Sequence, residues 1–183
     1  YDDDHLYVGA YLEDPHVQAT ITEKNAVIFH DPDFEIFLDP DGDTHHYYEF
    51  EINALGTLWE LYLEKPYHEG GPVHEGRNLP GLRSAVHVHG TFNDPTDEDE
   101  GWSVEVALPF EDLAHFCKGC ACPPRPGDQW RVNFSRVHWH YTIEAGVYRK
   151  TPKSERNEEN WVWSPQGLVD MHRPEHWGIV EFA

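Results

Sequence analysis

Apolar and polar residues alternate with a period of two over several short stretches of this chain. In the stretch that begins at Trp102, the side chains of Trp102, Val104 and Val106 share one face, opposite Ser103 and Glu105. Such alternation is typical of β-strands whose two faces meet different environments. Helical periodicity is nearly absent. We therefore expect eight strands, at residues 6–12, 34–38, 47–53, 57–63, 84–92, 102–108, 130–137 and 178–182.

Turn-forming residues separate these strands, as in Asp39–Asp43, and only residues 15–23 and 109–116 are expected to form short helices. The pattern predicts an all-β fold, an antiparallel β-sandwich of the jelly-roll or immunoglobulin-like type. No linker divides the 183 residues, so we expect a single domain over residues 1–183. The chain starts directly before an apolar strand, which leaves open that an upstream strand or a signal peptide precedes it.

One face of the two central strands is expected to be acidic. Glu35 shares a face with Phe37, and Glu49, Glu51 and Asn53 share a face on the next strand. The opposite faces are apolar. This composition fits a face that binds a polar ligand, and it also fits a simple solvated surface.

The charge of the chain excludes some partners. The formal net charge is −21, from 34 acidic and 13 basic residues, so nucleic acid and anionic membrane surfaces would be repelled. No stretch approaches the roughly 20 apolar residues that a membrane span needs, so we expect no membrane insertion. The charge is compatible with neutral polyols and divalent cations.

Aromatic residues make up 14% of the chain, which is more than a core of this size needs. Sugars bind by stacking on aromatic rings and by hydrogen bonds to planar polar side chains. Phe29, Trp161 and Trp163 could supply rings beside the acidic face. The alternative is that these rings belong to the core, as most do in β-sandwiches.

Several blocks along the chain together resemble the carbohydrate-binding module family 9-like domains. These domains are related to a wider group of extracellular sugar- and haem-binding sandwiches known as DOMON domains. The blocks cover nearly the whole chain in the expected order: residues 6–8, 34–42, 47–53, 101–109, 127–136, 161–167 and 171–178.

The resemblance implies a non-catalytic domain that binds an oligo- or polysaccharide, free-standing or covalently linked to a catalytic domain such as a glycoside hydrolase. It also implies a secreted, periplasmic or cell-surface location. Phe29 and Trp163 correspond to two clamping rings, and Glu51 stands near a position where relatives carry Arg. The carbohydrate-binding residues expected on this basis are Phe29, Glu35, Glu51, Asn53, Asn160 and Trp163.

Calcium is common in such modules, and two acidic loops could hold it, since Ca²⁺ prefers oxygen ligands. The first contains Asp39, Asp41 and Asp43. It does not follow the EF-hand spacing. The second contains acidic side chains at residues 94, 97 and 99. Acidic turns without metal are also common.

A short loop contains His115, Cys117, Cys120 and Cys122, a set that could ligate zinc. The alternative is an oxidised pair with one free thiol, in which Cys117 bridges more easily to either partner than Cys120 does to Cys122.

Two other functions remain as alternatives. Met171, the single methionine, precedes His172, and both are residue types that ligate haem in related sandwiches. The domain could also be structural, with a sugar site that has decayed. An enzyme is disfavoured, because nothing distinguishes an acid from a nucleophile among Glu35, Glu49 and Glu51.

Overall fold

The computed structural model describes residues 1–155 and 158–183, and it confirms the expected all-β sandwich. The strands are β1 (His5–Glu13), β2 (Asp33–Asp39), β3 (Tyr47–Asn53), β4 (Leu58–Leu63), β5 (Val73–Glu75), β6 (Arg83–His89), β7 (Gly101–Pro109), β8 (Gln129–His138), β9 (Tyr141–Glu144), β10 (Val147–Lys150), β11 (Glu159–Val162) and β12 (Gly178–Glu181). The short helical elements are α1 (Phe110–Leu113), η1 (Ile28–His30), η2 (Tyr67–Glu69), η3 (Ala114–Phe116) and η4 (Pro174–His176).

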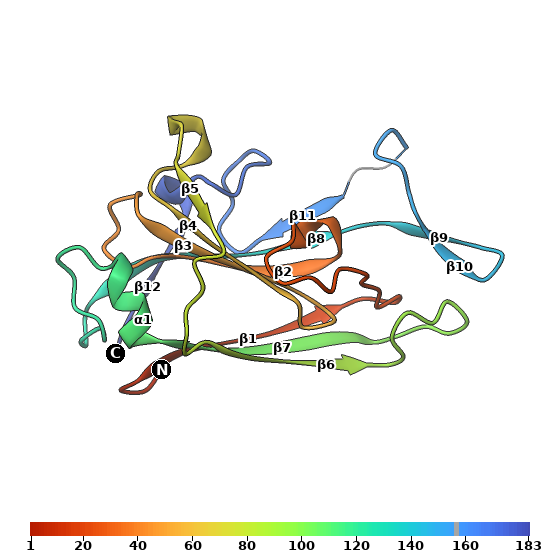
Figure 1. The fold of residues 1–183 in the computed structure, drawn as a ribbon, viewed down its shortest axis with the longest axis horizontal. Coiled ribbons are helices and arrows are strands. Elements are labelled where there is room, and N and C mark those ends of the chain that lie inside the picture. The colour runs from red at the N-terminus through yellow and green to blue at the C-terminus, as the bar shows by residue number, and fades with distance from the viewer. Residues whose placement is uncertain (156–157) are drawn as a thin grey trace.

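The strands form two layers and a separate hairpin (Figure 1). The smaller sheet has the order β1-β7-β6, and the larger sheet has the order β11-β8-β2-β3-β4-β5, with β12 also paired to β8. Every pairing is antiparallel. The β9–β10 hairpin projects away from the two layers.

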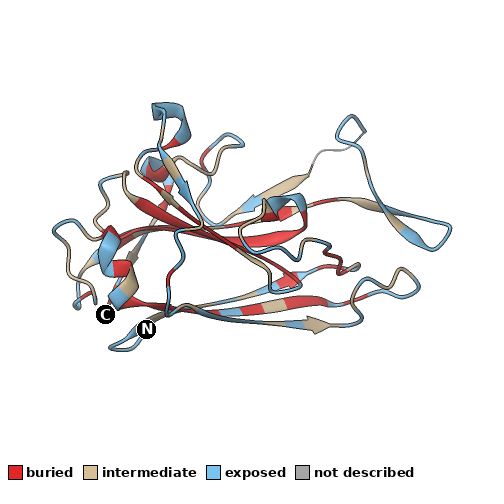
Figure 2. Ribbon diagram, in the orientation of Figure 1, coloured by how far each residue is buried: buried red, intermediate tan, exposed pale blue. Residues whose placement is uncertain are grey.

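The main core lies between the two sheets, at the positions to which the alternation assigns it. Ile36 of β2 lies opposite Phe50 of β3, and both belong to one buried cluster with Trp102 and Trp130. Figure 2 shows buried residues where the layers face each other and an exposed β9–β10 hairpin. Burial of these large side chains is the main stabilising contribution to such a fold.

The outer face of the larger sheet is also covered. A second buried cluster contains Phe37, Tyr47 and Trp177, and the loop before β12 folds over it. The Trp177 Nε1 group donates a hydrogen bond of 2.9 Å to the Met171 carbonyl oxygen, which fixes this loop. β2 and β3 are therefore buried on both faces, and the solvated-surface explanation of their acidic residues is wrong.

The expected helix at residues 109–116 is confirmed as α1 followed by η3. The expected helix at residues 15–23 is wrong, because side chains from distant loops bind its backbone amides. Asp99 accepts a hydrogen bond from the Val17 amide at 2.8 Å, and Asp31 accepts one from the Ile21 amide at 2.8 Å. These contacts replace the helical hydrogen bonds.

The eight expected strands are present with small shifts at their ends. β5, β9, β10 and β11 were not expected, and each is only three or four residues long. So short a segment shows too little alternation to be recognised in the sequence. In the part of the chain that the structure describes, no helix is long and apolar enough to cross a membrane.

Candidate binding site

The candidate site is built on a row of residues that crosses four strands of the larger sheet. Glu35 of β2 lies opposite both Glu51 of β3 and Ser135 of β8. Glu51 in turn lies opposite Trp59 of β4. Because directly paired residues share a face, all four side chains belong to the outer face. Glu49 shares this face, two residues before Glu51.

Loops close this row into a cavity of about 380 Å³. η1 contributes Phe29, η2 contributes Tyr67, and the loop before β12 contributes His172. In Figure 1 the η2 segment and the loop before β12 rise above the outer face of the sheet. The lining residues are Phe29, Glu35, Glu49, Glu51, Trp59, Leu61, Tyr67, Val137, Glu158, Asn160, Val169, Asp170, Met171 and His172.

The floor of the cavity consists of three buried glutamates. Glu51 Oε2 accepts a hydrogen bond of 3.0 Å from the Phe29 amide, and Glu35 Oε2 accepts one from the Ser135 hydroxyl. Burial raises the pKa of Glu35 to about 7. Burial and the charges of the neighbouring carboxylates raise the pKa values of Glu49 and Glu51 well above the usual range. Among the described residues that line the cavity there is no lysine or arginine to compensate these charges.

Three aromatic rings form the walls. The ring centroids of Phe29 and Trp59 lie 6.2 Å apart, and the Tyr67 ring lies 4.4 Å from the His172 ring. Trp59 is buried, whereas Phe29 is 37% exposed and Tyr67 is 50% exposed. Partly exposed rings above hydrogen-bonding side chains can stack on a sugar while its hydroxyl groups are held below.

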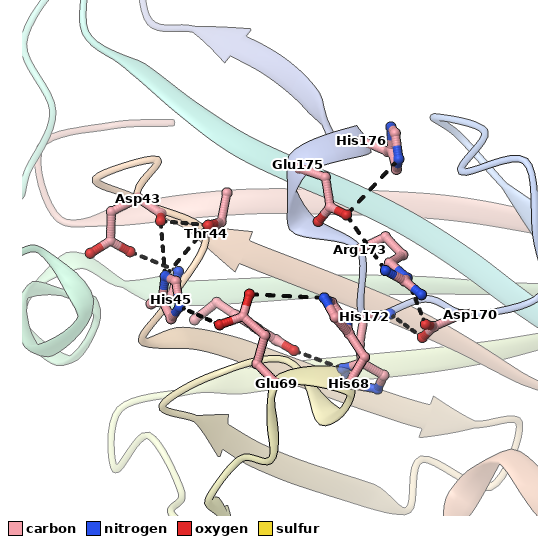
Figure 3. Close-up of polar contacts among 11 residues, drawn as sticks. Asp43, Thr44, His45, His68, Glu69, Asp170, His172, Arg173, Glu175 and His176 are labelled. Atoms are coloured by element: carbon pink, nitrogen blue, oxygen red, sulfur yellow. Dashed lines mark hydrogen bonds and ion pairs between the residues drawn. The ribbon is translucent and has the colours of Figure 1, made fainter.

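Ion pairs occupy the rim. Arg173 Nε lies 2.8 Å from Asp170 Oδ2 on the loop before β12 (Figure 3). Lys153 Nζ lies 2.8 Å from Glu158 Oε1. The acidic residues of the rim thus have cationic partners, unlike the glutamates of the floor.

His172 is the one basic side chain among the described residues that line the cavity. Its Nδ1 atom lies 2.9 Å from the Tyr47 hydroxyl, and its Nε2 atom lies 3.8 Å from Glu49 Oε2. Burial lowers the pKa of His172 to about 4, so its ring is neutral at pH 7. Met171 lies beside it and packs against the second core. The structure thus gives both candidate haem ligands contacts within the protein.

The cavity brings together four of the six residues expected from the sequence to bind sugar, namely Phe29, Glu35, Glu51 and Asn160. Asn160 reaches it from β11, where it pairs with Val137 of β8. Their contact with a ligand stays a prediction.

Asn53 does not line the cavity, because its side-chain amide is hydrogen-bonded to other protein groups. Its Nδ2 group donates to the Ile21 carbonyl at 2.9 Å and to Asp31 at 3.0 Å. Its Oδ1 atom accepts from the Leu55 and Thr57 amides at 3.1 and 3.0 Å. Asn53 is fully buried, and it fixes the turn after β3. We correct its expected role as a ligand-binding residue to a structural one.

Trp163 also lies outside this cavity. It lines a second, larger space of about 570 Å³ at the open edge between the sheets, together with Trp161, Phe34 and Phe134. The rings of Trp163 and Phe134 lie 5.7 Å apart. The expected pairing of Phe29 with Trp163 as a clamp is therefore not formed.

The cavity residues that were not among the expected sugar ligands include Glu49, Trp59 and Tyr67. The alternation already placed Glu49 on the correct face. Trp59 could have been found from the same alternation, because Trp59, Leu61 and Leu63 share a face of β4. Tyr67 lies in η2, where no periodic signal exists.

Within the described part of the chain, two groups of carboxylates could hold a metal ion. The oxygen atoms of Asp39, Asp41 and Asp43 lie within 4.8 Å of one another, which fits the expected calcium loop. Asp33, Glu35 and Glu51 form a second, fully buried group of the same kind. Among the described residues, the acidic loop at 94–99 forms no such group, and its Asp99 binds the Val17 and Thr91 amides instead.

The cysteine loop contains a disulfide bond between Cys117 and Cys120, and Cys122 is the free thiol. The four-ligand zinc arrangement cannot form in this oxidised state, because two of its thiols are bonded to each other. His115 contacts Arg77. The structure thus contains the oxidised alternative.

An antiparallel β-sandwich with an aromatic and carboxylate cavity on one sheet has the features of a binding domain for small polar ligands. A family model described as carbohydrate family 9 binding domain-like matches residues 1–122. The chain belongs to this family, as its resemblance in sequence implied.

One solved structure with a similar fold is described as a "putative carbohydrate-binding protein" from Bacteroides uniformis. The two chains share 21% identity with a TM-score of 0.66, over 99% of this chain and 74% of the other. At this identity, the likeness shows the fold alone. Comparison with curated proteins gives no significant match.

Proposed function

We propose that this chain binds the end or an exposed segment of an oligo- or polysaccharide in the outer-face cavity. The observation that carries the proposal is the convergence of Phe29 and Tyr67 above Glu35, Glu51 and Asn160. The rings offer stacking surfaces, and the polar side chains offer hydrogen bonds to hydroxyl groups. Membership of the carbohydrate-binding family supports the same class of ligand.

We also propose that the domain binds without cleaving. A glycoside hydrolase holds two carboxyl groups in different environments, one protonated and one ionised, on either side of the bond. Here Glu35, Glu49 and Glu51 lie on adjacent strands in one buried environment, and the pKa of each is raised. No carboxyl group of the floor is favoured as the ionised partner.

We propose that the domain works outside the cytoplasm, alone or linked to an enzyme that acts on the same polysaccharide. The disulfide bond between Cys117 and Cys120 supports an oxidising compartment. We further propose that the loop of Asp39, Asp41 and Asp43 holds a structural calcium ion.

The binding proposal is tested by titrating the protein with a panel of gluco-, xylo- and manno-oligosaccharides while following tryptophan fluorescence. Trp59 lines the cavity, so its emission should report an occupant. Saturable binding of at least one oligosaccharide, without release of new reducing ends, is expected. Absence of binding to the whole panel at millimolar concentration would contradict the proposal.

A further inference from the structure

The floor of the cavity contains more buried acid than hydroxyl recognition requires. Glu35, Glu49 and Glu51 line it together, and each is less than 5% exposed. Glu49 Oε2 has no hydrogen-bond partner among the described protein groups. The buried Nε1 group of Trp59 also has none. Buried polar atoms in native proteins are paired with protein groups, ordered water or a ligand, so these two atoms are available to a partner that enters the cavity.

The charges around these glutamates indicate what that ligand supplies. The acids of the rim, Asp170 and Glu158, already pair with Arg173 and Lys153. No lysine or arginine is among the described residues that line the cavity. Without a positive charge close to them, burial and mutual repulsion favour the protonated form of these carboxyl groups, and a cation bound in the cavity would favour their ionised form.

We propose, on the basis of the sugar-binding function above, that the cavity selects a glycan that carries a protonated amine, as a 2-amino-2-deoxy sugar does. An ammonium group has three donors and no acceptor, which matches a floor of carboxylate oxygens. The sugar ring would stack on Phe29 or Tyr67. Aromatic walls also favour a cation near their faces.

A bare divalent cation is the competing occupant, because Asp33, Glu35 and Glu51 have oxygens within 4.8 Å of one another. The remaining features favour the amine. Asp33 does not line the cavity, and its Oδ1 atom is bound to the Val137 amide at 2.9 Å, which leaves its unpartnered Oδ2 atom as the one oxygen it could offer an ion. A single ion would also leave the aromatic walls and most of the 380 Å³ unused.

The proposal is tested by calorimetric titration of the unmodified chain with three β-1,4-linked trisaccharides, of glucosamine, N-acetylglucosamine and glucose. They share linkage and ring shape and differ at carbon 2. The glucosamine trisaccharide is expected to bind at least about tenfold more tightly, which is about 1.4 kcal/mol. Because the attraction is ionic, this advantage should shrink when NaCl is raised from about 20 to about 500 mM.

Glu49→Gln and Glu51→Gln should each remove most of the preference, whereas Glu144→Gln on the exposed β9–β10 hairpin, outside the cavity, should keep it. Circular dichroism confirms that each variant is folded, and the comparison of three sugars on the unmodified chain needs no variant. Equal or tighter binding of the glucose trisaccharide would overturn the amine preference and leave sugar binding intact. Absence of binding by every saccharide would overturn both.

Calcium chloride alone is titrated into the Asp41→Asn, Asp43→Asn double variant, which lacks two carboxylates of the other acidic loop. Calcium binding that Glu35→Gln abolishes, and that excludes the trisaccharide, would replace the amine by a metal ion and overturn the proposal. Absence of such binding supports it.

Discussion

Glu35 and Glu51 lie directly opposite each other on β2 and β3, on a face where both are buried. Like charges in this position destabilise a sheet. The folded protein therefore favours protonation at this site, and burial raises the pKa of Glu35 from its usual 4.5 to about 7.

Stability should consequently fall as the pH rises through this range. A carboxyl group whose pKa is raised by folding stabilises the protein below its unfolded pKa, and the contribution is lost as the pH passes the folded value. From about pH 5 to about pH 8, Glu35 alone should reduce the free energy of unfolding by about 2–3 kcal/mol. Urea denaturation at about pH 5 and about pH 8 measures this change in the free energy of unfolding. Glu35→Gln should weaken the dependence, and an unchanged dependence would show that other groups cause it.

The ring of Trp163 packs directly against the backbone of Gly178. A Cβ atom at residue 178 would overlap the six-membered part of the Trp163 ring. We expect Gly178→Ala to push this half-exposed ring outward, to change tryptophan emission and to cost about 1 kcal/mol of stability. Sugar binding should not change, because Trp163 lies outside the cavity. A loss of sugar binding in this variant would indicate that the edge space takes part.

The cysteine loop should contain one free thiol, that of Cys122. Alkylation of the denatured, unreduced protein followed by mass spectrometry should label Cys122 alone, because Cys117 and Cys120 are bonded to each other. In the native protein the labelling should be slow at pH 8, since burial raises the pKa of Cys122 to about 11. Three labelled cysteines without reductant would contradict the disulfide.

Calcium should stabilise the protein through the loop after β2. The oxygens of Asp39, Asp41 and Asp43 converge, and burial together with the two neighbouring charges raises the pKa of Asp39 to about 7. A bound cation would relieve this repulsion. The melting temperature should rise with calcium and fall with chelator, and the Asp41→Asn, Asp43→Asn double variant should lose the response. An unchanged melting temperature in the unmodified protein would argue against a metal here.

The sandwich could be predicted from the sequence, because alternation in the long strands assigns residues such as Ile36 and Phe50 to the core face. The acidic row could also be predicted, since Glu35 and Glu51 alternate with these core residues. The burial of this row could not be predicted, because it depends on the loop at residues 163–177, which folds over the outer face of the larger sheet. Asn53 lies on the expected face, but its side chain is hydrogen-bonded to the Ile21 carbonyl and to Asp31, which belong to loops distant in the sequence.

The position of Trp163 could also not be predicted from the sequence. Asn160 and Trp163 are only three residues apart, yet Asn160 lies on β11 and points to the cavity, while Trp163 follows the strand and lines the edge space. Side chains three positions apart on an extended backbone point to opposite faces, and the register of β11 against β8 decides which of them points to the cavity. Four residues do not specify that register in the sequence.

The central claim, that the outer-face cavity is the sugar site, is tested most directly by comparing Phe29→Ala with Trp163→Ala. Both remove a partly exposed ring, but only Phe29 lines the cavity. With the oligosaccharide that binds best, Phe29→Ala should weaken binding about tenfold, as expected for loss of a stacking ring. Trp163→Ala should bind as the unmodified protein does. The reverse result, a loss confined to Trp163→Ala, would place the sugar in the space between the sheets and contradict the account.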